Sequence, residues 1–70
     1  MINIEIENNI VKYNGFEGYF DSTEYVDDKF FHIIIGGIPL GVTIKDTTLN
    51  NQSYASTELF IDAINQLTTT

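Results

Sequence analysis

The stretch Phe30–Ile44, which contains the longest apolar run of the sequence, is the feature that most limits the folds open to this chain. It is rich in β-branched residues, which favour strands, and it is interrupted by Gly36, Gly37 and the only proline. Because glycine adopts positive φ and proline fixes φ at about −65°, the chain must reverse here. The run therefore predicts two antiparallel strands, at about Lys29–Ile35 and Gly41–Asp46, joined by a turn.

The amino-terminal residues 1–8 alternate between apolar and polar types. A period of two predicts a strand with one buried and one wet face, the isoleucines facing the core. Asn8 and Asn9 follow, and asparagine tolerates the left-handed conformation of a tight reversal. We expect Ile10–Tyr13 to return as a second strand.

The next segment, residues 16–25, is also strand-like in composition. Asn14 and Gly15 precede it and predict either a turn or a bulge. Phe16 and Phe20 fall on one face, which we expect to pack on the core. The opposite face carries acidic residues and is expected to be wet.

Towards the carboxyl end, the polar segment Asp46–Ala55 predicts a loop, and helical periodicity starts at the suitable N-cap Ser56. We expect the terminal threonines, residues 68–70, to fray. One apolar stripe of the helix is formed by Leu59, Phe60, Ala63, Ile64 and Leu67. The sequence thus predicts one α+β domain over residues 1–70, an antiparallel sheet of three to four strands with this helix on one face.

Charge excludes several kinds of partner. Ten acidic residues and three lysines give a formal net charge of −7. Nucleic-acid binding typically uses about 6–10 cationic phosphate contacts. We therefore expect neither direct nucleic-acid binding nor attachment to an anionic membrane. A basic protein partner is favoured instead, the alternative being that the charge serves only solubility.

Groups for catalysis are scarce. The chain has no cysteine, no arginine and one histidine, His32, which lies in an apolar strand and is expected to be structural. Glu24, Asp27 and Asp28 lack the alternate spacing and the glycine of a calcium loop, so a solvated turn is expected there. We expect no enzymatic activity, no cofactor and no metal. The amino terminus lacks the features of a signal peptide, which favours a cytoplasmic protein of a bacterial cell.

Acidic side chains are predicted to gather on one side and end of the sheet, next to two tyrosines. Their spacing could imitate nucleic-acid phosphates and occupy a basic groove. The residues expected to bind a partner are Glu5, Glu7, Glu17, Tyr19, Asp21, Glu24, Tyr25, Asp27 and Asp28.

Three segments resemble the amino-terminal domain of HicB-type antitoxins: YNGFEGYF at Tyr13–Phe20, YVDDKFFHIIIGGIPL at Tyr25–Leu40 and STELFIDAINQL at Ser56–Leu67. Residues at matching places are Tyr13, Gly15, Phe16, Gly18, Asp27, Asp28, Phe31, His32, Gly37, Ile38 and Leu40. The sequence departs from the family pattern in its longer 45–55 segment. We also expect the usual DNA-binding domain of the family to be lacking. The resemblance implies the fold and the binding of a basic RNA-acting protein.

Three functional hypotheses follow. The first is an inhibitor, of the phage anti-CRISPR or anti-defence type, that blocks a basic nuclease or RNA-guided effector by mimicry or occlusion. The second is a minimal HicB-type antitoxin that neutralises a small RNase toxin. The third is a structural homodimer paired through an exposed edge strand.

Overall fold

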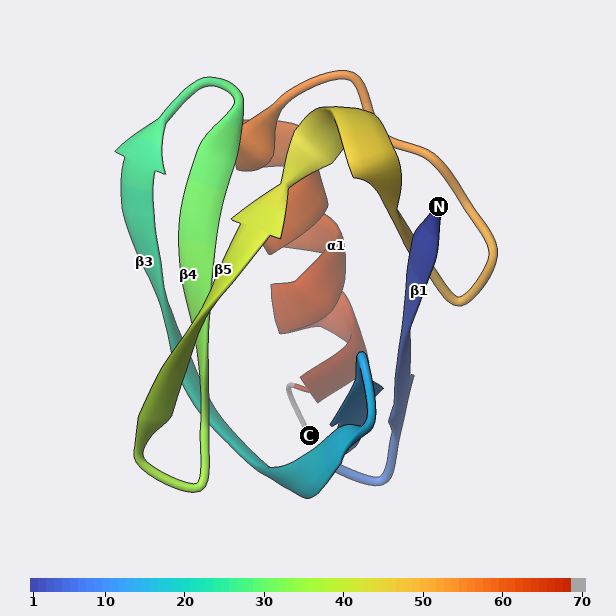
Figure 1. Ribbon diagram of the computed structural model, residues 1–70, viewed down its shortest axis with the longest axis vertical. Coiled ribbons are helices and arrows are strands. Elements are labelled where there is room, and N and C mark those ends of the chain that lie inside the picture. The colour runs from blue at the N-terminus through green and yellow to red at the C-terminus, as the bar shows by residue number, and fades with distance from the viewer. Residues whose placement is uncertain (69–70) are drawn as a thin grey trace.

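The computed structural model describes residues 1–68 as a six-stranded sheet with one α-helix packed on it (Figure 1). The elements are β1 (Ile2–Glu7), β2 (Ile10–Tyr13), β3 (Phe16–Asp27), β4 (Phe30–Ile35), β5 (Ile38–Thr43), the 3-10 helix η1 (Ile44–Asp46), β6 (Thr47–Leu49) and α1 (Thr57–Thr68). The strand order is β5-β4-β3-β2-β1-β6, and β6 lies parallel to β1. The α+β class and the two layers are confirmed, but the sheet is mixed and has more strands than predicted.

Two-residue turns make the tight reversals. In residues 1–68, four pairs have both residues at positive φ. These pairs are Asn8–Asn9, Asn14–Gly15, Gly36–Gly37 and Asn50–Asn51. The first three join hairpins of the I′ kind, whose twist matches that of the flanking strands and which favour asparagine and glycine. The pair Asn14–Gly15 is therefore a turn and not a bulge.

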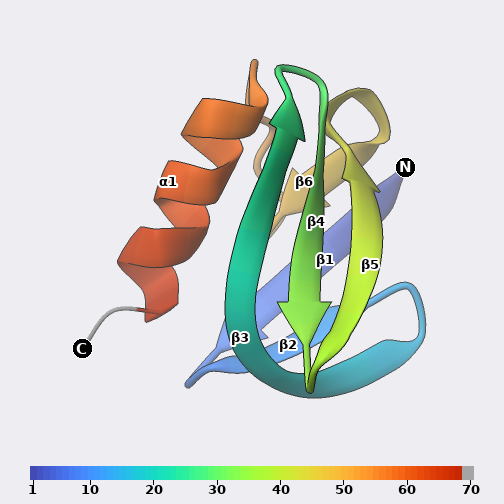
Figure 2. The ribbon, with the colours of Figure 1, turned by 90° about the vertical axis from the view of Figure 1, so that its left-hand side faces the viewer.

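β3 is bent, and its bend shapes the whole molecule. Register shifts against β4 leave Asp21 and Val26 as extra residues, and such bulges increase the bend and twist of a strand. The first part of β3 pairs with β2, and the remainder, from Phe20 on, pairs with β4. The sheet is consequently rolled, with β1, β2 and β6 forming one wall and β4 and β5 the other (Figure 2).

The core lies between these walls, where α1 closes one side. Phe31 and Phe60 are fully buried, with ring centroids 5.3 Å apart. On the other side, the Tyr13 hydroxyl donates a hydrogen bond of 2.7 Å to the Gly41 carbonyl oxygen and so ties β2 to β5. The buried hydrophobic residues are Ile4, Ile6, Val11, Tyr13, Phe31, Ile33, Ile35, Val42, Ile44, Leu49, Phe60 and Ile64.

The segment predicted as a loop, Asp46–Ala55, contains β6, and its three residues are all buried. The Asn50 side chain extends the pairing of β6 with β1. Its Oδ1 accepts the Ile6 N–H at 3.1 Å and its Nδ2 donates to the Ile6 carbonyl at 3.4 Å. The loop prediction was wrong because a three-residue threonine-rich strand, paired with the distant β1, leaves no periodic signal.

β5 also differs from its predicted range. It begins at Ile38 and includes Pro39, and residues 44–46 form η1 instead of continuing the strand. Proline is tolerated here because β5 is an edge strand, so a missing N–H need not break a ladder bond.

The helix starts as predicted, since the Ser56 hydroxyl accepts the Leu59 N–H at 3.3 Å. The predicted stripe is too wide. Phe60 and Ile64 are fully buried, whereas Leu59 and Leu67 are 53% and 46% exposed, because the helix contacts the sheet along a narrower face. Thr68 is helical and not frayed, and the expected fraying of residues 69–70 lies outside the described residues.

Candidate partner-binding surface

The outer face of β1, β2 and the start of β3 carries two cross-strand rows. In the register, Glu5 lies opposite Lys12, which lies opposite Glu17. The adjacent row is formed by Glu7, Ile10 and Tyr19. Adjacent strands lie about 4.8 Å apart and same-face neighbours about 7 Å apart along a strand, so the Cα atoms of the three glutamates lie within about 12 Å of one another.

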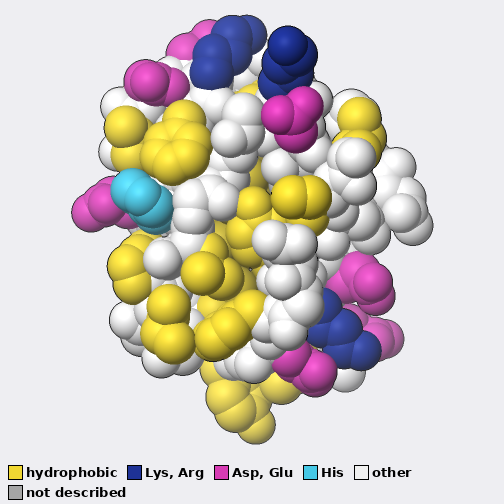
Figure 3. Space-filling model, viewed as in Figure 1, with side chains coloured by type: hydrophobic (Ala, Val, Ile, Leu, Met, Phe, Trp, Pro, Cys, Tyr) yellow, Lys and Arg dark blue, Asp and Glu magenta, His cyan; other side chains and the backbone are white. Residues whose placement is uncertain are grey.

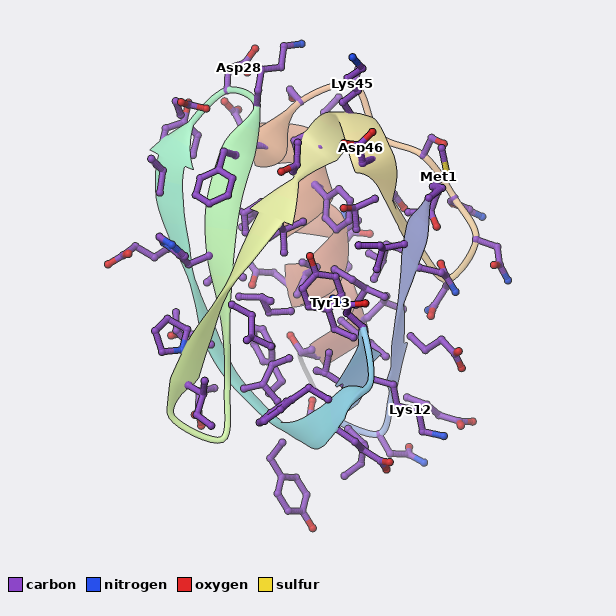
Figure 4. All side chains as sticks on the ribbon, in the orientation of Figure 1. Met1, Lys12, Tyr13, Asp28, Lys45 and Asp46 are labelled. Carbon is purple, nitrogen blue, oxygen red and sulfur yellow. The ribbon has the colours of Figure 1, made fainter. Side chains whose placement is uncertain are left out.

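We call Glu5, Glu7, Glu17 and Tyr19 the acidic wall. All four side chains are exposed, and Tyr19 has 69% of its surface in contact with solvent. Lys12 is also exposed and offsets part of the negative charge of its two glutamate neighbours. Figure 4 shows Lys12 pointing away from the molecule, whereas Tyr13 lies between the two walls of the sheet. The acidic wall is thus a charged surface with one large aromatic group.

Two other predicted residues are engaged in local contacts. The Asp21 carboxylate, at the first bulge of β3, accepts the Gly37 N–H and so braces the β4–β5 turn. Glu24 lies opposite His32, and its Oε1 is 3.2 Å from the His32 Nδ1. The His32 and Phe30 rings also pack edge to face, with centroids 5.2 Å apart. His32 therefore makes structural contacts on the outer face of β4.

The turn between β3 and β4 is formed by Asp28 and Lys29, one residue later than predicted, because Asp27 still pairs with Phe30 at the end of β3. The Asp27 carboxylate accepts the Lys29 N–H at 2.8 Å. The backbone carbonyl of Asp28 accepts the Thr57 N–H at 2.9 Å, which fixes the start of α1 to this turn. In Figure 4, Asp28 lies at the opposite end of the molecule from Lys12.

The prediction of one continuous acidic side and end is wrong. Because the sheet is rolled, Glu24 lies on the outer face of the other wall. Tyr25 pairs with Phe31 and lies on the face on which α1 packs, at its exposed margin. Figure 3 shows acidic side chains as separate groups around a largely hydrophobic centre. Of the nine predicted residues, the structure brings together the four of the acidic wall.

Burial raises the pKa of Tyr13 above its usual 10.0, and a hydrogen bond with the Thr47 side chain offsets part of this. Within residues 1–68, no group of three or more His, Asp or Glu side chains could hold a metal ion. The described part of the chain contains no helix long and apolar enough to cross a membrane.

Sequence reasoning missed a groove between β3 and α1. Tyr25 lines it together with Glu58, Leu59 and Asp62 of the helix. The signal that could have revealed it is Leu59, the first leucine of the helix, whose position beside the buried Phe60 sets it at the rim of the helix face.

No family model matches the sequence, and no curated protein or solved structure matches the chain. The HicB-type resemblance remains a prediction based on the residues that carry it.

Proposed function

We propose that this protein is a non-enzymatic inhibitor that binds and blocks a basic nucleic-acid-handling protein, such as a nuclease or an RNA-guided effector. The observation that carries the proposal is the acidic wall: three exposed glutamates whose Cα atoms lie within about 12 Å on paired strands, with the exposed Tyr19 in the same row as Glu7. Such a surface attracts a basic groove during encounter, and exposed tyrosines are common anchors of interfaces.

The size of the domain is consistent with this role. Its accessible surface is 4345 Å². A standard interface takes about 800 Å² from each partner, which is nearly a fifth of that area. The acidic wall and its surroundings could therefore form one complete interface.

The test compares two double variants that remove the same charge. Glu5→Gln with Glu17→Gln neutralises the acidic wall, and Asp28→Asn with Asp46→Asn neutralises exposed carboxylates elsewhere. Inhibition is measured on purified nucleases and RNA-guided effectors at about 0.15 M salt. We expect the wall variant to raise the half-inhibitory concentration about tenfold and the control to change it less than about threefold. Equal changes, or inhibition of no protein tested, would reject this role for the wall.

The second candidate is a minimal HicB-type antitoxin. It is supported by the three segments that resemble that family, Tyr13–Phe20, Tyr25–Leu40 and Ser56–Leu67. It predicts that co-expression rescues cells from a small basic RNase toxin. The acidic-wall variant would lose this rescue too, so the two candidates differ in the target and not in the surface.

The homodimer hypothesis loses support at β5. Pro39 has no N–H that could donate a hydrogen bond at this edge, and the Gly41 carbonyl already accepts a hydrogen bond from the Tyr13 hydroxyl. Strand pairing between two copies through β5 would lack a donor at Pro39 and would compete with the Tyr13 hydroxyl for the Gly41 carbonyl.

A further inference from the structure

The second half of β3 is an open sheet edge. β2 pairs with β3 only from Phe16 to Tyr19, whereas β4 pairs with it from Phe20 to Asp27. In the described chain, no strand pairs with the other side of residues 21–27. Figure 2 shows α1 running beside this part of β3.

The register determines which backbone groups this edge presents. The two-residue turn makes Ile35 and Ile38 a hydrogen-bonded pair, so alternate residues of β4, His32 and Ile34, direct their N–H and C=O groups to β3. Their partners are Glu24 and Ser22. Thr23 lies between Ser22 and Glu24, and Tyr25 follows Glu24. Thr23 and Tyr25 therefore direct their own N–H and C=O groups away from β4.

The side chains beside this edge form a groove with a mixed surface. Tyr25 and Leu59 are 57% and 53% exposed and provide its apolar part. Glu58 and Asp62 provide carboxylates, and α1 carries no lysine or arginine to neutralise them. The groove thus combines free backbone groups, apolar contact and negative charge.

Other edges of the sheet are protected. Pro39 and the hydrogen bond between Tyr13 and Gly41 occupy β5. At β6, Leu49 exchanges two backbone hydrogen bonds with Gln52, at 2.8 and 2.9 Å. Natural sheets commonly block their edges in such ways, so an edge left open beside a groove is a candidate for binding.

We propose that the groove between β3 and α1 binds an extended segment of a partner protein that directs every second side chain toward α1, these being an apolar residue between two lysines or arginines. The segment adds to β3 as a strand, its backbone bonding to Thr23 and Tyr25, its apolar side chain contacting Leu59 and its cations facing Glu58 and Asp62. A second copy of this chain is a poor occupant, since the edge residues Glu24 and Asp27 and the net charge of −7 would repel each other. The inference deepens the proposed function by naming how a basic partner is held.

The first test uses a fluorescent peptide of about seven residues with lysine, leucine and lysine at every second position and threonine at the positions between them, and a charge control with glutamate in place of lysine. We expect the lysine peptide to bind and to slow amide hydrogen exchange at Thr23 and Tyr25. Glu58→Gln with Asp62→Asn should weaken binding about tenfold, whereas Glu5→Gln with Glu17→Gln, an equal loss of charge on the acidic wall, should change it less than about threefold. Equal losses, or protection of other amides, would overturn the proposal.

A second pair of variants isolates the apolar contact without changing charge. Leu59→Ser removes the exposed leucine of the groove, and Leu67→Ser removes the exposed leucine at the other end of α1. Only Leu59→Ser should weaken peptide binding, by about threefold to tenfold. Self-association that protects Thr23 and Tyr25 without peptide would instead assign the groove to a second copy and reject the proposal. If Glu5→Gln with Glu17→Gln loses inhibition but still binds the peptide, the acidic wall and the groove are two separate binding surfaces.

Discussion

The inner and outer faces of the rolled sheet place sequence neighbours in opposite environments. Phe31 is fully buried against Phe60, whereas His32, the next residue, lies half-buried on the outer face beside Glu24. In β1, Ile4 is fully buried and Glu5 is exposed. The inner face supplies the stability of the domain, so the outer face is free to carry charges that contribute little to folding. Substitutions at adjacent positions test this division.

The largest effect is expected at Phe31. Phe31→Ala removes a fully buried ring and should lower the free energy of unfolding by about 3–5 kcal/mol. His32→Ala, one residue away on the outer face, should cost less than about 1 kcal/mol. Urea unfolding measures both.

A domain of this size has a total stability of roughly 4–10 kcal/mol, so Phe31→Ala could unfold it. Phe31→Leu then serves as the milder variant, because it keeps most of the buried volume. A cost for His32→Ala as large as that for Phe31→Leu would contradict the division between the faces.

Asn50 is expected to have the next largest effect. Asn50→Gly removes the carboxamide that bonds the Ile6 N–H and carbonyl, and should cost about 1–3 kcal/mol. Asn51→Gly is the matched control, because both residues have positive φ, which glycine adopts without strain. We expect Asn51→Gly to stay within about 0.5 kcal/mol of the parent. Similar costs for the two variants in urea unfolding would show that the carboxamide adds little to the β1–β6 pairing.

The sequence was sufficient for features that local chemistry decides. The alternation of residues 1–8 identified the inner face of β1, where Ile4 and Ile6 are buried. The pair Asn8–Asn9 identified a turn, and Ser56 identified the start of α1. Each of these depends on residues close together in the chain.

Features set by distant contacts were not predictable in the same way. β6 is buried only because β1 lies beside it, and the bulges at Asp21 and Val26 depend on how β3 meets β4. The sequence pattern contains no sign of this bend, and without it the acidic residues form one continuous surface. With it, Glu24 and Tyr25 leave the surface that carries Glu17 and Tyr19.

Tyr13 joins the two walls, and Tyr13→Phe tests that link with a smaller expected effect. Loss of the hydrogen bond to Gly41 should cost about 0.5–1.5 kcal/mol near neutral pH. The pKa of Tyr13 is raised in the folded state, so the parent keeps its full stability below pH about 10 and loses stability as the pH rises through the folded-state pKa. Urea unfolding across this alkaline range should show a smaller loss for Tyr13→Phe. An identical alkaline loss in both proteins would mean that other groups cause it.

The smallest effect is expected for Glu24→Gln, on the outer face of β4. The Glu24 Oε1 lies 3.2 Å from the His32 Nδ1, but the Glu24 side chain is 68% exposed, so solvent screens the pair. We expect a change in the free energy of unfolding of less than about 0.5 kcal/mol, because glutamine can still accept a hydrogen bond from the ring. Thermal and urea unfolding of Glu24→Gln and of His32→Gln measure it, and the double variant gives the coupling between the two residues. A coupling above about 1 kcal/mol would place this outer-face pair among the stabilising contacts and would weaken the distinction between the two faces. A coupling near zero would leave Glu24 free to contribute its charge to a partner, as the acidic residues of the outer face are proposed to do.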